Sequence, residues 1–503
     1  MHFVKNFLLS KSHPEKYPET LAVLATLDVL GKDHPDVQRA ILAEIEQQRT
    51  TLKLIASENY SSLAVQLAMG NLLTDKYAEG APFHRFYAGC SNVDAIEAEA
   101  CEQLCQLFGC DHAYVQPHSG ADANMVAFWA ILAKRLQPQF LEKCGVRSIA
   151  QLTDVQFEEL RQLFCSQTVL GMSLPSGGHL THGARVNMSA KFMRAVTYDV
   201  DPKTHLLDYD AILEIARREK PAILIAGFSA YSRNINFAKM RAIADEVGAT
   251  LLVDFAHFSG LVAGGVLTGE ENPIPYADVI TSTTHKSLRG PRGGLILCTN
   301  AYKEYIDKGC PFVLGGPLPH VMAAKLVAFR EAAQPEFRTY AQRVVENARA
   351  LAQSLQDLGA TILTGGTDNH IVLIDVQASF GLTGMQAEKA LTSVGILANR
   401  NSIPGDTNGP WFCSGIRLGS LALTTRGLGT SEMRKVGRWI FDILATARPA
   451  KNEATKKLDR GNVILDEKRA TKVKEDRGKL LADYPLYPEI PEFKENYAGR
   501  ITE

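Results

Sequence analysis

Hydrophobic residues in the middle of this chain form short continuous runs, separated by stretches of helical periodicity. The apolar runs cover residues 222–226, 251–254, 279–281 and 295–298, and a helical pattern spans 238–247. Continuous apolar runs of this length are typical of strands that are buried on both faces of a sheet. The alternation predicts an α/β fold whose sheet is mostly parallel, with crossover helices and a reversed last strand.

A different pattern begins near residue 336. Apolar residues recur every three or four positions over 337–358, which predicts a long amphipathic helix that links two domains. Beyond it, expected strands at 371–376 and 415–418 and helices at 383–393 and 430–447 indicate a small α+β unit. The predicted domains are an N-terminal arm (1–50), a large α/β domain (51–335, with an insertion at 134–169), a small C-terminal domain (336–448) and a charged extension (449–503). The insertion and the extension are expected to be surface decoration.

Composition narrows the functional classes. The chain has 503 residues, 46% of them hydrophobic, and a formal net charge of −1, which gives no electrostatic case for nucleic acid or a membrane surface. The short apolar run at the start supports no secretory signal, and no apolar stretch is long enough to span a bilayer. Nine cysteines, an odd number, favour reduced thiols in a cytoplasmic enzyme. His179 and His182 have no third ligand at suitable spacing, so no metal site is predicted.

Lys286 lies directly after the 279–281 run, among threonine and serine residues and before a turn rich in glycine and proline. A lysine in such a place can form a Schiff base with an aldehyde, although a solvated charge is the ordinary alternative. Asp254 ends an apolar run 32 residues earlier, where it can also be a helix cap. A carboxylate that pairs with a pyridinium nitrogen, together with a lysine Schiff base, is the minimal signature of a pyridoxal phosphate site. Ser119 and Gly120 open a helix, where backbone N–H groups suit a phosphate.

These residues carry a family resemblance: the chain resembles the serine hydroxymethyltransferases. The matching blocks follow the family order between about residues 30 and 448. Besides the Asp254 and Lys286 runs, they are LIASENY at 54–60, KYAEG at 76–80, VQPHSG at 115–120, GGHLTHG at 177–183, GFSAYS at 227–232, GGTDNH at 365–370 and SGIR at 414–417.

The resemblance implies a pyridoxal phosphate-dependent fold of type I, with the cofactor covalently bound to Lys286. The implied reaction moves the hydroxymethyl carbon of L-serine to tetrahydrofolate, giving glycine and 5,10-methylenetetrahydrofolate in one-carbon metabolism. Two alternatives remain. One is a folate-independent aldolase or racemase acting on β-hydroxy amino acids or alanine, and the other is a catalytically silent, cofactor-binding regulatory protein.

The resemblance also implies a role for particular residues. The catalytic residues would be Lys286, Glu79, Asp254, His179 and Tyr87. The other cofactor contacts would be Ser119, Gly120, Ser229, His257, His285, Tyr77, Gly315 and Gly316. Arg417, Ser57 and Tyr87 would bind the amino acid, and Leu174, Gly178, His179, Leu180 and Asn401 the folate. Taken alone, each histidine could be an interior polar group and Glu79 a turn residue. Burial beside Tyr77 or Tyr87 would suit Glu79 to general acid work.

The resemblance further implies a homodimer, in which Tyr77, Glu79, Gly315 and Gly316 reach the neighbouring pocket. Gly409-Pro410-Trp411 and Asp122 depart from the family pattern. We expect these departures to affect the binding of the pterin and the phosphate.

Overall fold

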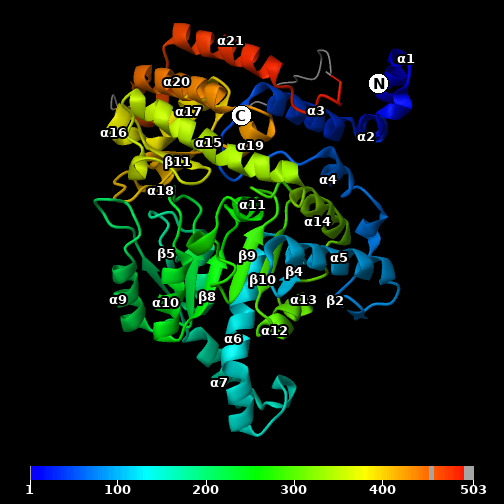
Figure 1. The fold of residues 1–503 in the computed structure, drawn as a ribbon, viewed down its shortest axis with the longest axis vertical. Coiled ribbons are helices and arrows are strands. Elements are labelled where there is room, and N and C mark those ends of the chain that lie inside the picture. The colour runs from blue at the N-terminus through cyan, green and yellow to red at the C-terminus, as the bar shows by residue number, and fades with distance from the viewer. Residues whose placement is uncertain (1, 452–457, 492–503) are drawn as a thin grey trace.

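A seven-stranded sheet forms the centre of the larger unit (Figure 1). The computed structural model describes residues 2–451 and 458–491. The strand order is β4-β10-β9-β8-β7-β5-β6. The strands are β4 (His112–Tyr114), β5 (Thr168–Met172), β6 (Arg194–Tyr198), β7 (Ile223–Gly227), β8 (Thr250–Asp254), β9 (Val279–Thr283) and β10 (Gly294–Cys298). Strands β6, β5, β7, β8 and β9 are parallel, whereas β10 is antiparallel to β9 and β4. The predicted sheet, including its reversed last strand, is confirmed.

Helices cover both faces of this sheet. Strands β5, β7, β8, β9 and β10 are buried along their whole length, which explains their continuous apolar runs. The helices of this unit are α5 (Ser91–Phe108), α6 (Gly120–Cys144), α8 (Ser189–Phe192), α9 (Tyr209–Glu219), α10 (Phe237–Val247), α11 (Ser259–Ala263), α12 (Lys303–Asp307), α13 (Gly309–Phe312) and α14 (Pro319–Ala332). Within the described ranges, no helix combines the length and the apolar character that a membrane span requires.

The insertion continues a helix of the core. The insertion is predicted to begin at residue 134, but α6 continues through Pro138 to Cys144, so the insertion begins inside this helix. The insertion then forms α7 (Asp154–Cys165), which projects from the sheet in Figure 1. Its last two residues are not surface decoration, because Thr168 and Val169 are buried in β5.

The smaller unit is built on a three-stranded antiparallel sheet of order β11-β14-β13. Its strands are β11 (Ile371–Asp375), β13 (Asn399–Asn401) and β14 (Gly415–Gly419). The predicted linking helix is α15 (Pro335–Asp357), and its buried stripe includes Val344, Ala348 and Leu351. The other helices are α16 (Val376–Phe380), α17 (Gly384–Ser393), α18 (Gly409–Phe412), α19 (Leu421–Thr425) and α20 (Thr430–Thr446).

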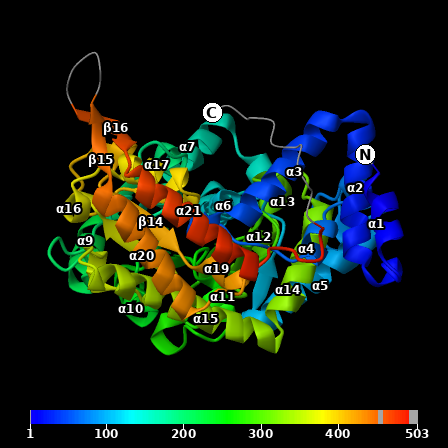
Figure 2. The same ribbon diagram turned by 90° about the horizontal axis from the view of Figure 1, so that it is seen from above.

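The N-terminal segment joins the smaller unit through one strand pair, and the C-terminal helix lies over α20 of that unit (Figure 2). The N-terminal elements are α1 (Phe3–Ser10), α2 (Pro18–Asp33), α3 (Pro35–Thr50), β1 (Leu52–Lys53), α4 (Leu63–Leu67), β2 (Gly80–Ala81) and β3 (His84–Arg85). β1 pairs with β12 (Ile396–Leu397) of the smaller unit. The C-terminal elements are β15 (Arg448–Lys451), β16 (Leu458–Ile464) and α21 (Glu467–Asp483).

The C-terminal extension is more than surface decoration. Ala470, Val473, Leu480 and Leu481 of α21 are buried in the same hydrophobic cluster as α15 and α20. Arg426 ties the end of this helix to the body by donating to the carbonyl oxygens of Tyr484 and Leu481. Residues 452–457 and 492–503 of the predicted extension lie outside the described residues.

The packing of α21 makes its contribution to stability measurable. Leu481 is 5% exposed, so Leu481→Ala should lower the free energy of unfolding by about 2–5 kcal/mol through lost burial and a residual cavity. The exposed neighbour Lys479 offers the control, because Lys479→Ala should change it by less than about 0.5 kcal/mol. Denaturant unfolding would measure both, and equal effects would contradict the packed role of α21.

Candidate active site

The carboxyl ends of β8 and β9 and the start of α6 meet at one edge of the central sheet. β8 ends at Asp254 and Lys286 follows the end of β9, and these residues are only 8% and 9% exposed. A Cβ at Gly120, the first residue of α6, would lie 2.7 Å from the side chain of Thr283 in β9. Ligands of open α/β folds bind at this edge. The fold thus gathers the predicted carboxylate, lysine and helix start around one pocket.

Hydrogen-bond donors surround the Asp254 carboxylate. Oδ2 accepts from Asn124 Nδ2 at 2.9 Å and lies 3.1 Å from His182 Nε2, while Oδ1 accepts from the backbone N–H of Ala256 at 3.2 Å. Burial alone would raise the pKa of Asp254, but the hydrogen bond and charge of His182, helped by His179 and Asn124, lower it well below its ordinary value. The carboxylate therefore stays ionised inside the protein.

Asn124 and His182 were missed by the sequence analysis. Asn124 lies in the first turns of α6, where Thr281 Oγ1 donates to its Oδ1, and His182 follows His179 in a short turn. The structure also supplies a third group near both histidines, because ligand atoms of His179, His182 and Asp254 lie within 4.8 Å of one another. Sequence spacing could not indicate this third group, because Asp254 lies 72 residues after His182. The contact between His182 and Asp254 accounts for this cluster without an ion.

Lys286 and Arg417 bring two cations into the same pocket. Burial lowers the pKa of Lys286 to about 8, with Asp254 opposing this shift and Arg417 and Arg292 adding to it. Arg417, in β14, donates from Nη1 to the carbonyl oxygen of Ser229 at 2.6 Å and from Nε to Asn399 Oδ1 at 3.1 Å. It forms no ion pair with any of the described residues, and burial lowers its pKa to about 10. Such a guanidinium is ready for an anionic ligand.

The histidines around Lys286 are held in the neutral form. Burial lowers the pKa of His179 to about 4 and that of His285 to about 3. It also lowers the pKa of His257 well below its ordinary value, with Lys286 and Arg417 adding to the shift. His257 stacks on His370, with ring centroids 5.4 Å apart, and the sequence analysis did not assign His370 to the site. Neutral, planar rings suit packing against an aromatic cofactor.

The helix start at Ser119 carries an acidic neighbour. The Ser119 hydroxyl accepts from the backbone N–H of Asp122 and donates to the Asp122 carboxylate at 3.0 Å. Ser119 is thus the N-cap of α6, and it adjoins the backbone N–H groups of the first helical turn. Any phosphate that binds here lies near a negative charge.

The residues predicted to bind folate are only partly brought together. Leu174 and His179 line one cavity of about 330 Å³, and Leu180 is 44% exposed. Gly178 has no room for a side chain, since a Cβ would lie 1.9 Å from the carbonyl oxygen of Met172. Asn401 lies in β13, where its side chain donates to the carbonyl oxygen of Ser402. Ser57 is predicted to bind the amino acid rather than the folate. It follows Ala56, which packs against Gly419 at the end of β14.

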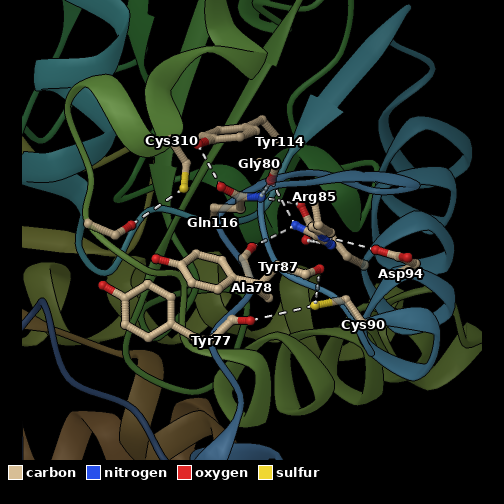
Figure 3. Close-up of polar contacts among 12 residues, drawn as sticks. Tyr77, Ala78, Gly80, Arg85, Tyr87, Cys90, Asp94, Tyr114, Gln116 and Cys310 are labelled. Atoms are coloured by element: carbon tan, nitrogen blue, oxygen red, sulfur yellow. Dashed lines mark hydrogen bonds and ion pairs between the residues drawn. The ribbon is translucent and has the colours of Figure 1, made fainter.

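A second group of predicted site residues lies apart from the Lys286 pocket. Tyr77, Glu79 and Tyr87 belong to one segment, in which the rings of Tyr77 and Tyr87 are 4.8 Å apart (Figure 3). The Tyr77 hydroxyl hydrogen-bonds Glu79, whose charge is the main cause that raises the pKa of Tyr77. Gly316 lies against the Tyr77 ring, and Gly315 has open space around it.

Among the described residues, no hydrogen bond or ion pair joins this second group to Asp254, Lys286 or Arg417. The chain therefore carries two separate halves of the predicted site, one buried and one on the surface.

Comparisons with known proteins identify the family of this chain. A family model described as serine hydroxymethyltransferase matches residues 30–141 and 157–440. The chain is 52% identical to the serine hydroxymethyltransferase of Treponema pallidum, over 97% of this chain and 85% of that protein. It is 54% identical to the enzyme of Cutibacterium acnes (92% and 94%) and 55% identical to that of Mycolicibacterium smegmatis (93% and 94%).

The sheet and the family match define a pyridoxal phosphate-dependent enzyme of fold type I. The chain belongs to the serine hydroxymethyltransferase family. This family holds pyridoxal phosphate covalently on a lysine and uses tetrahydrofolate as co-substrate. The pocket fits that cofactor, because it offers a buried amine at Lys286, an ionised carboxylate at Asp254, neutral imidazoles and a helix N-terminus.

The Asp122 carboxylate should lower the affinity of the site for the cofactor phosphate. Asp122→Asn removes a like charge beside the helix start and keeps a polar side chain, so cofactor affinity should rise by about three- to tenfold. Titration of the cofactor-free protein, followed by cofactor absorbance, would measure this. Asp111→Asn, in the turn before β4, is the control and should leave affinity unchanged. Unchanged or weaker binding in the Asp122 variant would show that no phosphate lies near this carboxylate.

Proposed function

We propose that the pocket around Lys286 is the place where this chain interconverts serine and glycine with tetrahydrofolate. The single observation that carries this assignment is the convergence of a buried lysine, an ionised buried carboxylate and a partly buried arginine, Arg417, that forms no ion pair with any of the described residues. Pyridoxal phosphate, when bound, supplies an electron sink for cleavage of the bond between the α- and β-carbons of serine. The hydroxymethyl carbon passes to tetrahydrofolate, and glycine remains.

The protein groups have separable tasks in this proposal. Asp254, kept ionised by its donors, accepts a hydrogen bond from a protonated pyridine nitrogen. His179, kept neutral by burial, packs its flat ring against the cofactor. Arg417 binds the amino-acid carboxylate through its planar fork, and Ser57 on the neighbouring turn assists.

Lys286 serves as both anchor and base. Its pKa of about 8 leaves an appreciable fraction of the amine neutral near pH 7, and a neutral amine is the nucleophilic form. Because Asp254 and Arg417 act on this pKa in opposite directions, binding of an anionic substrate at Arg417 removes one of the charges that lower it. The buried position also keeps water away from the reacting atoms.

The remaining proton-handling group comes, in this proposal, from a second copy of the chain. Glu79 is partly exposed, and it is not among the groups that shift the pKa of Lys286 in the same chain. The segment around Glu79 exposes large apolar side chains. These exposed side chains are Leu72, Tyr77, Phe83, Phe86, Tyr87 and Phe312. An apolar surface of this kind suits a partner. A homodimer would bury it and bring Tyr77, Glu79, Tyr87, Gly315 and Gly316 to the neighbour's pocket.

The folate is proposed to bind beside His179. Leu174 and Leu180 are exposed apolar residues there, and the neighbouring cavity has room for part of a pterin. Gly178 lets the backbone approach closely, and Asn401 supplies a polar group from β13. A folate-independent aldolase or racemase, or a silent binding protein, would leave this apolar surface without an occupant.

Nine free cysteines among the described residues support the cytoplasm as the proposed location.

Lys286 should be the residue that carries the cofactor. Borohydride reduction of the loaded protein followed by peptide mapping should find the cofactor carbon attached to Nζ of Lys286. Lys325 is the internal control, since it is also buried but donates to three carbonyl oxygens, from Val115, Pro117 and Gly294. A label on Lys325 would overturn the assignment.

Glu79→Gln should separate substrate binding from carbon transfer. The amide keeps the shape of the side chain but cannot exchange a proton, so folate-dependent transfer should fall by about a hundred- to ten-thousand-fold while glycine still binds. Stopped-flow absorbance and a serine turnover assay would measure the two steps. Near-normal turnover would mean that Glu79 is only a turn residue.

Mixed dimers test whether the pocket is shared. When the Glu79→Gln and Lys286→Ala variants are combined, one pocket of each mixed dimer inherits both lesions and the other inherits neither. Activity should therefore recover on mixing. No recovery, with subunit exchange demonstrated by differently tagged chains, would contradict a shared pocket.

A further inference from the structure

One guanidinium nitrogen holds the backbone on both sides of Glu79. Nη1 of Arg85 donates to the carbonyl oxygen of Ala78 at 2.9 Å and to that of Gly80 at 2.7 Å (Figure 3). Arg85 and Gly80 are also cross-strand partners in the β2–β3 hairpin. A Cβ at Gly80 would lie 2.4 Å from the carbonyl oxygen of His84, so the chain turns here only with glycine. The Ala78–Glu79 and Gly80–Ala81 peptide groups are thereby held, with Glu79 between them.

Arg85 is itself locked in place by two carboxylates of α5. Nε donates to Asp94 Oδ1 at 2.7 Å and Nη2 donates to Glu97 Oε2 at 2.6 Å. The side chains of Arg85, Asp94 and Glu97 are 3%, 10% and 1% exposed. A buried guanidinium with all three nitrogens engaged has one orientation, and its planar fork has no equivalent in lysine. This cluster therefore anchors the hairpin rigidly to α5.

Gln116 adds a second support from the central sheet. Its Nε2 donates to the carbonyl oxygen of Gly80 at 2.8 Å and to Glu97 Oε1 at 2.7 Å, and its Oε1 accepts from the Tyr114 hydroxyl at 2.9 Å. Gln116 is 1% exposed and lies just after β4, three residues before Ser119. The Gly80 carbonyl is thus held from two directions.

We propose that Arg85 and Gln116 are positioning residues that fix the direction in which Glu79 projects from the hairpin. Neither side chain contacts Asp254, Lys286 or Arg417, so any effect on the reaction must pass through the segment that they hold. This inference rests on the proposed role of Glu79 in proton transfer. A general acid must lie within hydrogen-bonding reach of its target, and a misplacement of about 1 Å costs roughly a hundredfold in rate.

A double-mutant cycle tests the proposal. Arg85→Lys keeps the charge but cannot hold both carbonyls and both carboxylates, so folate-dependent transfer should fall by about ten- to a hundredfold in the otherwise native dimer. In the Glu79→Gln background the same substitution should change the rate of single-turnover transfer by less than about twofold. The side chain at position 79 can then no longer exchange a proton, so its position matters little. Gln116→Met, which has a similar shape, should show the same pattern, with a smaller loss of transfer when Glu79 is present.

A direct readout of the segment accompanies the rates. The Phe86 N–H donates to the carbonyl oxygen of Glu79 at 3.0 Å, so hydrogen exchange of this amide in the cofactor-free protein should accelerate in Arg85→Lys. Arg330→Lys is the matched control. Arg330 also pairs with a glutamate of α5, Glu99, but on the exposed surface, and its substitution should change neither exchange nor transfer.

The outcomes separate the two hypotheses. The positioning role would be overturned if Arg85→Lys reduced transfer equally with Glu79 and with Gln at position 79. It would also be overturned if Arg85→Lys changed neither the hydrogen exchange of the Phe86 amide nor the rate of transfer. Both outcomes would leave the role of Glu79 intact. Normal transfer in Glu79→Gln alone would overturn the role of Glu79 and the positioning inference with it. Should Arg85→Lys fail to fold, the Gln116→Met cycle decides between the same outcomes.

Discussion

The negative charge of Asp254 is the constraint on which the candidate site depends. A carboxylate at this depth is costly unless donors surround it, and here the donors come from three separate parts of the chain. Asn124 belongs to α6, His182 to a turn after β5, and the Ala256 N–H to the end of β8 itself. These segments must pack in the correct register before the charge is stable. The fold and the electrostatics of the pocket are therefore established together.

The same charge organises its wider surroundings. It counteracts the effects of burial, Arg417 and Arg292 on Lys286, so the amine keeps a pKa of about 8. Arg417 has no such partner among the described residues and keeps an unneutralised charge at the far side of the pocket. The candidate site thus holds one cation whose charge Asp254 offsets, Lys286, and one that has no ion-pair partner among the described residues, Arg417. That difference separates the group that anchors the cofactor from the group that awaits a substrate anion.

Much of this arrangement could be predicted from local patterns. Apolar runs located β7, β8, β9 and β10, and motif matches located Asp254 at the end of β8, Lys286 after β9 and Arg417 in β14. Asn124 and His182 could not be found in this way, because their importance arises only from contacts with a carboxylate 130 and 72 residues later. The burial of α21 was also missed, since its narrow apolar stripe lies within a strongly charged segment.

The continuity of α6 gives this molecule an unusual tolerance for change. The helix has 25 residues and is about 37 Å long, so its start at the pocket and its end near α7 are far apart. Only the N–H groups of its first turn act on an anion, and the influence of the helix dipole fades within that turn. Residues added or removed at the far end of α6 therefore do not change the electrostatic effect of the helix on an anion at the pocket. This end is a natural attachment point for a fluorescent label or a fused domain in an enzyme that must remain active.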